Sequence, residues 1–277
     1  MINETFQRYW NVSQYIIKYF KQIMIDIAIE YPIFFFKRTA KGKAPSTWTE
    51  LTQQQFIAIS RTVNGMEPDF RFLSVLTGID QNLLKTLSPF NLFKLSEAID
   101  FIGRAGNSYS EFLIPKIPGT DFVAPKPKLS GLTFGQFIYT ESYYNDWLSG
   151  KDETALNKFI ASLYLNPNEK FKSELIGNNA VKIKSVSMDI RQAIAFNYGL
   201  IMIWLQKCYP LIFQDNVEAR HDSSLPSKQT NQSQWLKTFE SLVGDDLINQ
   251  DRYAELSVHA VLRYLTNKYK ESSRNSS

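Results

Sequence analysis

The sequence predicts a mainly α-helical protein: an irregular helical domain with a small N-terminal β-element and a C-terminal helical arm. Most of the chain consists of short segments whose apolar side chains recur every three or four positions, the spacing of one helix face. Only residues 25–33 alternate apolar and polar side chains as a strand does. A polar stretch at 214–233 separates the last helical segments from the rest.

The composition is that of a globular protein and argues against several classes. The 277 residues are 44% hydrophobic and 14% aromatic, and they carry a formal net charge of +4. This content supports a substantial core, while the charge is too small to indicate nucleic-acid binding by itself. A single cysteine excludes an intrachain disulfide framework and fits the cytoplasm. The longest uncharged apolar run, residues 192–206, is shorter than the roughly 20 residues of a membrane span.

The N-terminal part combines three predicted segments. Residues 1–23 place aromatic and aliphatic side chains at helical spacing among lysines, which predicts an amphipathic appendage. Met24, at the change of period, is an alternative start of the folded unit. The strand at 25–35 is expected to pair with short extended pieces of the proline-rich stretch 108–131, and residues 37–45 are interpreted as a basic turn.

Two similar stretches, LTQQQFI at 51–57 and LTFGQFI at 132–138, predict helix starts. Thr52 and Thr133 are good N-caps, and a glutamine three residues later completes a capping box in each. Similarity ends after the isoleucine, so the two stretches are local helix-start motifs and not copies of a domain.

The remaining elements follow from cap and stop residues. Between the two motifs, helices are predicted at 69–78, 80–87 and 88–103. After the second motif, helices are predicted at 134–149, 154–165 and 188–208, with a loop at 166–186. The predicted organisation is an appendage at 1–23, a main domain at 24–213, a linker at 214–233, a helical arm at 234–270 and a disordered tail at 271–277.

Few residues point to catalysis or to a cofactor. Cys208 and His221 are the one Cys/His pair close in sequence, but Cys208 ends the most apolar helix and His221 lies in the linker. His259 lies beside an apolar stripe, and Asn197 is expected to bind backbone groups from inside its helix. Gly244-Asp245-Asp246 is interpreted as a helix end followed by an acidic cap. The sequence therefore predicts no enzyme, no metal and no cofactor.

Four segments in order resemble a poorly characterised family encoded among tail and virion genes of bacteriophages and prophages. They are TWTELTQQQFIAIS, KLSGLTFGQFIYTESYY with NKFIASLYL, IAFNYGLIMIWLQKCYPLIF, and WLKTFESLVGDDLINQDRYAELSVHAVLRYL. The middle portion is similar to small helical tail-assembly chaperones, and the resemblance spans about residues 24–270. It implies a non-catalytic protein of the bacterial cytoplasm that binds a long helical tail protein of the tape-measure type.

The predicted partner-binding side chains lie on the C-terminal helices. They are Trp235, Phe239, Leu242, Val261, Leu262 and Leu265. The alternative is that these helices fold back and complete the core of their own domain. Two other functions remain open: a structural virion component that self-associates, and, less favoured, a nucleic-acid-binding module that uses Lys37–Lys43 and Lys182–Lys184.

Overall fold

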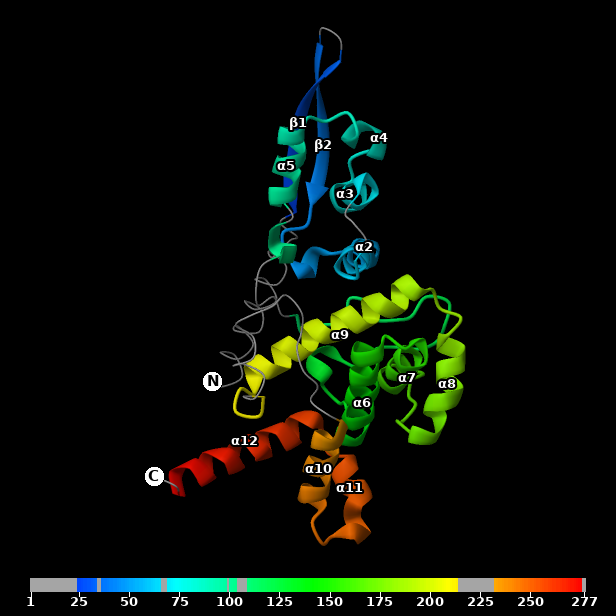
Figure 1. The fold of residues 1–277 in the computed structure, drawn as a ribbon, viewed down its shortest axis with the longest axis vertical. Coiled ribbons are helices and arrows are strands. Elements are labelled where there is room, and N and C mark those ends of the chain that lie inside the picture. Colours follow the sequence, from blue (N-terminus) through cyan, green and yellow to red (C-terminus); the bar gives the residue numbers. More distant parts are fainter. Residues whose placement is uncertain are drawn as a thin grey trace, which may run out of the picture. The chain divides into compact units, whose positions relative to one another are not determined.

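The computed structural model describes residues 24–33, 36–65, 69–98, 100–103, 109–213 and 232–275. It divides the chain into two compact units, residues 1–105 and 106–277. The fold is mainly α-helical with a small N-terminal β-element, as predicted (Figure 1). Among the described helices, none combines the length and apolar character required to cross a membrane. The predicted appendage at 1–23 lies outside the described residues, as does nearly all of the predicted linker.

In its described residues, the first unit joins a two-stranded antiparallel hairpin to four α-helices and two short 3-10 helices (η). Its elements are β1 (Ile25–Ile33), β2 (Phe36–Ala44), η1 (Trp48–Glu50), α2 (Gln53–Val63), α3 (Phe70–Thr77), α4 (Gln81–Leu84), α5 (Pro89–Ala98) and η2 (Asp100–Gly103). Asp69 and Asp80 cap α3 and α4 as expected, and Gly78 ends α3 in the left-handed conformation. Ile29 and Ala40 of the hairpin pack against Ile79, Leu84 and Leu95 to form a hydrophobic core.

The partner of β1 differs from the prediction. Residues 36–44, which include the supposed basic turn, form β2 and pair with β1 from Ile33↔Phe36 to Ile25↔Ala44. No residue of the stretch 109–131 pairs with β1. The alternation of β2 was inconspicuous because its inward positions carry Ala40, Gly42 and Ala44, which give little hydrophobic signal. A side chain at Gly42 would collide with the Thr77 carbonyl, so the small residue lets α3 approach the strand.

The second unit is helical. Its elements are η3 (Pro127–Leu129), α6 (Phe134–Gly150), α7 (Glu153–Leu163), η4 (Ser173–Leu175), α8 (Ile176–Ile183), α9 (Met188–Cys208), α10 (Gln232–Val243), η7 (Leu247–Asn249), α11 (Gln250–Ala254) and α12 (Val258–Asn275). Helix α8 was missed and assigned to a loop because Gly177, Asn178 and Asn179 are weak helix formers. Ile176, Ala180 and Ile183 nevertheless supply a buried face at helical spacing. Helix α12 also continues into the predicted tail, as far as Asn275.

The stretch 109–131 is irregular, as the prolines predict, and is fastened to α9 and α7. The amide of the fully buried Asn197 accepts from Leu113 N (2.7 Å) and donates to the Glu111 carbonyl (3.0 Å). This confirms the expectation that Asn197 satisfies backbone groups. Val123 and Leu165 exchange backbone hydrogen bonds, which ties the same stretch to the end of α7.

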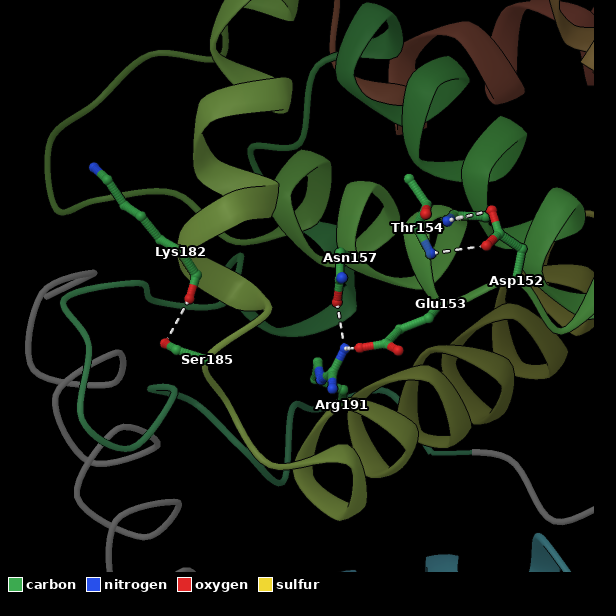
Figure 2. A network of polar contacts seen from close by, with 8 residues as sticks. Asp152, Glu153, Thr154, Asn157, Lys182, Ser185 and Arg191 are labelled. Carbon is green, nitrogen blue, oxygen red and sulfur yellow. Dashed lines mark hydrogen bonds and ion pairs between the residues drawn. The ribbon is translucent and has the colours of Figure 1, made fainter.

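Helices α7 and α9 are joined by a polar contact at their N-terminal ends. Figure 2 shows the buried Arg191 of α9 reaching Glu153 and Asn157 of α7, with Nη1 at 2.8 Å from Glu153 Oε1 and 2.6 Å from Asn157 Oδ1. Asp152 accepts hydrogen bonds from the first amides of α7 and fixes where that helix begins. The network has a structural role, because Asp152 fixes the start of α7 and Arg191 joins α9 to α7.

Candidate protein-binding groove

The groove begins at the second helix-start motif. Thr133 accepts a hydrogen bond from Gln136 N and caps α6. The side chain of Gln136 does not close the predicted capping box. Its Nε2 instead donates to the carbonyls of Ser162 (2.8 Å) and Leu163 (3.3 Å), the last residues of α7. The start of α6 is thereby fixed to the end of α7.

The C-terminal helices dock on the same motif. Phe134 N donates to the Leu256 carbonyl (2.7 Å) and Val258 N donates to the Leu132 carbonyl (3.1 Å). A Cβ at Gly135 would lie 3.1 Å from the Cβ of Ala254, so glycine lets α11 approach α6 closely. Residues 132–135 therefore both start a helix and anchor α11 and α12.

An aromatic cluster anchors α10 beside this contact. The Trp235 ring lies 5.1 Å from that of Phe137, 6.1 Å from that of Phe134 and 5.7 Å from that of Phe213. These edge-on arrangements are favourable for aromatic pairs. Trp235 is consequently only 4% exposed.

The predicted partner-binding side chains thus separate into two groups. Trp235, Val261 and Leu262 are buried in the second unit, as in the alternative interpretation in which the helices complete their own domain. Phe239, Leu242 and Leu265 are partly exposed. The C-terminal helices belong to the second unit. The structure also divides the predicted main domain near residue 105, a boundary that the composition did not indicate.

Between α6, the segment 165–174 and the pair α10–α11 lies an open groove of about 930 Å³. Its aromatic and aliphatic lining includes Tyr139, Phe171, Leu236 and Phe239, and the Tyr139 and Phe171 rings are 5.6 Å apart. Phe239 is the one predicted binding residue that lines it. No sequence pattern indicated the groove, because its walls come from three separate segments of the chain.

One polar group of the groove is buried without a partner. Ser142 lines the groove, and its buried hydroxyl makes no hydrogen bond within the described residues. A buried hydroxyl normally has a partner, since leaving it unpaired costs about 1–3 kcal/mol.

The charges around the groove are mainly negative. Its lining holds the carboxylates of Glu169, Glu174, Asp251 and Glu255, and the ammonium groups of Lys170 and Lys172. The chain as a whole carries +4, so the groove is an acidic region on a basic protein. A ligand that fits it would carry positive charge beside an apolar face.

A buried carboxyl lies behind the groove. Glu141 of α6 accepts a 2.7 Å hydrogen bond from the Tyr198 hydroxyl of α9. Burial raises the pKa of Glu141 to about 7, although this hydrogen bond partly opposes the shift. The Trp235 indole N–H also favours the charged form, but it makes no hydrogen bond of ordinary geometry within the described residues. Burial and the nearby Glu141 raise the pKa values of Tyr144 and Tyr198.

The residues considered for catalysis do not form a site. Cys208 is largely exposed, but partial burial of its thiol raises the pKa, which lowers its reactivity as a nucleophile. His221 lies outside the described residues. His259 bonds to the Tyr209 hydroxyl (2.8 Å) and to the Lys128 carbonyl (2.6 Å), which holds the turn at 128–129 in its left-handed backbone conformation.

The acidic pair after α10 has a local role that differs in detail from the prediction. Gly244 ends α10 with a positive φ, as expected. The Asp246 carboxylate caps no backbone amide, and instead accepts from the side chains of Asn249 (2.8 Å) and Tyr253 (3.3 Å). Within the described residues, no group of three His, Cys, Asp or Glu side chains is placed to hold a metal ion.

The basic stretches considered for nucleic acid lie in different units. Lys37 and Lys43 of β2 form exposed ion pairs with Glu30 and Asp26 across the hairpin. Lys182 and Lys184 are exposed at the end of α8.

Comparisons of this chain with protein-family models, with curated proteins and with solved structures found no match.

Proposed function

We propose that this protein is a non-catalytic binding factor that holds a helical segment of a partner protein in the groove between α6, residues 165–174 and α10–α11. The observation that carries the proposal is the groove itself. It is open, and Tyr139, Phe171, Leu236 and Phe239 give it an aromatic and aliphatic lining. Grooves of this kind bind the apolar face of an amphipathic helix.

The charges of the groove support a basic partner. Four carboxylates and two lysines at the rim favour a helix with lysine or arginine beside its apolar face. Tyr139, Phe171 and Phe239 would contact the apolar face, and Asp251 and Glu255 would face the basic side chains.

The resemblance of the four segments to phage tail-gene proteins gives this binding activity a context. The partner would be a long helical tail protein of the tape-measure type. The protein would keep it from aggregating in the bacterial cytoplasm while the tail assembles.

A permanent virion component is the second candidate, and one observation favours it. At the tip of the α10–α11 hairpin, Leu247 is 66% exposed and Ile248 is 98% exposed. Neighbouring aliphatic side chains this exposed are typical of a surface that another subunit covers.

Capture from a lysate of the native host, followed by chemical cross-linking and mass spectrometry, tests the proposal. Truncation at Phe213 is unsuitable, because it would remove Trp235 from the aromatic cluster and expose Phe134 and Phe137. Point variants avoid this difficulty. Leu236→Asp changes a half-exposed groove residue, and Val181→Asp is a matched control on the exposed face of α8.

The wild type and Val181→Asp should recover one long helical protein, cross-linked to the groove through a basic segment, and Leu236→Asp should not. Equal recovery by Leu236→Asp, or cross-links that lie outside the groove, would overturn the proposal. Recovery of assembled tail particles through Leu247 and Ile248 would favour the virion component.

A further inference from the structure

Helix α12 consists of a buried beginning and an exposed remainder. Val258, Val261 and Leu262 are at most 2% exposed and pack in the second unit. From Arg263 onward most side chains are exposed. Figure 1 shows α12 extending away from α6, α10 and α11. Residues 263–275 span about 20 Å as a helix.

The exposed part of α12 continues the apolar stripe of the buried part. Val258, Leu262, Leu265 and Tyr269 follow one another at intervals of three or four residues and therefore share one face. The first two are buried, Leu265 is partly exposed and Tyr269 is 54% exposed. Tyr264, 49% exposed, adds a second aromatic ring.

The same part of α12 is basic. Its charged side chains are Arg263, Lys268, Lys270, Arg274 and the single acid Glu271. The ammonium group of Lys268 lies over the Tyr264 ring, 5.6 Å from its centre. Residues 263–275 are therefore a basic amphipathic helix, the chemistry that the groove is expected to bind.

We propose that residues 263–275 of α12 of one copy bind in the groove of a second copy. This inference rests on the groove being the helix-binding site of the proposed function, and it names a partner for that site. Charge complementarity carries it: Arg263, Lys268 and Lys270 would face Asp251, Glu255 and Glu174, and Tyr269 would reach Phe171 or Phe239. The helix does not line its own groove and extends away from it, so the groove that it enters belongs to another copy.

Such a contact is head-to-tail. The two surfaces are different parts of the molecule, so each bound copy still offers a free groove and a free α12. Assemblies therefore grow by successive addition and either close into a ring or remain open. Because the contact pairs exposed charges, it weakens as the salt concentration rises.

Charge reversal on purified protein tests the inference. Asp251→Lys/Glu255→Lys reverses the groove, and Lys268→Glu/Lys270→Glu reverses the helix. All four side chains are exposed, so each variant should fold. Lys182→Glu/Lys184→Glu on α8 changes the charge as much as the helix variant does, and serves as its control.

The measurement is molar mass against protein concentration, by sedimentation or by light scattering. The wild type and the α8 variant should form dimers and larger species, and 0.5 M salt should reduce them. Self-association of each reversed variant alone should be at least about tenfold weaker than that of the wild type. A mixture of the two reversed variants should recover association, since each surface then meets an opposite charge.

Three outcomes would overturn the inference: a wild type that stays monomeric, an α8 variant that loses association as fully as the helix variant, or a mixture that does not recover. Failure here is separable from failure of the proposed function. The Lys268→Glu/Lys270→Glu variant has an intact groove that the α12 helices of other copies no longer fill. Partner capture with this variant therefore tests the groove alone.

Discussion

The two helix-start motifs have the same local structure but make different tertiary contacts. In both, threonine caps the helix, the phenylalanine is fully buried, and the glutamine Nε2 reaches the last carbonyls of the following helix. Gln55 donates to Leu76 at 3.1 Å, and Gln136 donates to Ser162 at 2.8 Å. The motif thus starts one helix and fixes the end of the next.

The differences lie at two positions inside the motif. Gln53 and Gln54 of α2 correspond to Phe134 and Gly135 of α6. Gln54 is exposed, whereas Phe134 is buried beside Trp235 and Gly135 contacts Ala254. Two residues therefore distinguish a helix start that faces solvent from one that holds α10 and α11. The comparison leads to four predictions, ordered by expected effect.

The largest effect is expected from exchanging these residues. Phe134→Gln/Gly135→Gln gives α6 the residues of α2, and should destabilise the second unit by more than about 4 kcal/mol, because a buried ring is lost and α11 is displaced. Gln53→Phe/Gln54→Gly, the reverse exchange in α2, should change stability by about 1 kcal/mol or less. Hydrogen exchange should localise the loss to α10–α12. Equal effects of the two exchanges would contradict this account.

The next effect depends on pH. Four residues after the phenylalanine, α2 carries Ser60 and α6 carries Glu141. The pKa of Glu141 rises from 4.5 to about 7 on folding, so its contribution to stability is complete below about pH 4.5 and is lost as pH rises through 7. The free energy of unfolding of the second unit should fall by about 2–3 kcal/mol between pH 5 and 8.

Glu141→Gln provides the control for this pH dependence. It keeps a group that accepts from Tyr198 but cannot ionise, and should remove most of the slope. Denaturant unfolding at several pH values measures it, and an unchanged slope in the variant would assign the dependence to other groups.

A smaller effect separates the two glutamines. Gln55 Oε1 also accepts from Thr52 N, which completes the capping box, whereas Gln136 makes no such bond. Gln55→Glu also places a carboxylate oxygen near two carbonyls, those of Val75 and Leu76, but it keeps the oxygen that accepts from Thr52 N, so it should cost less, about 1–2 kcal/mol. Gln136→Glu places a carboxylate against two carbonyls and should cost about 2–3 kcal/mol. Thermal unfolding of the two variants measures both costs. A larger cost for Gln55→Glu than for Gln136→Glu would show that the capping box matters less than the contacts with the carbonyls.

The smallest effect concerns the caps themselves. Thr52→Ala and Thr133→Ala should each cost about 1 kcal/mol, and serine at either position should restore most of it. Because the Leu132 and Phe134 backbone groups also bond to residues 256–258, fraying of α6 should be smaller than fraying of α2. Amide exchange in the first turn of each helix measures this difference.

The local elements follow from residues that are close together in the sequence, and these could be predicted. Thr52, Asp69, Thr133 and Gly78 mark helix ends through short-range hydrogen bonds and backbone conformation, and those ends are where they were predicted. The strand at 25–33 and the irregular stretch 109–131 were equally visible, because alternation and prolines act within a few residues.

Other features depend on tertiary contacts and could not be predicted from sequence patterns. The partner of β1, the burial of Trp235 and Leu262, and the second role of Gln136 depend on segments that are distant in sequence. An apolar helix face indicates that it will be covered, but not what covers it. The groove exists only because α6, residues 165–174 and α10–α11 meet, and Phe134 and Gly135 bring α10 and α11 there by packing.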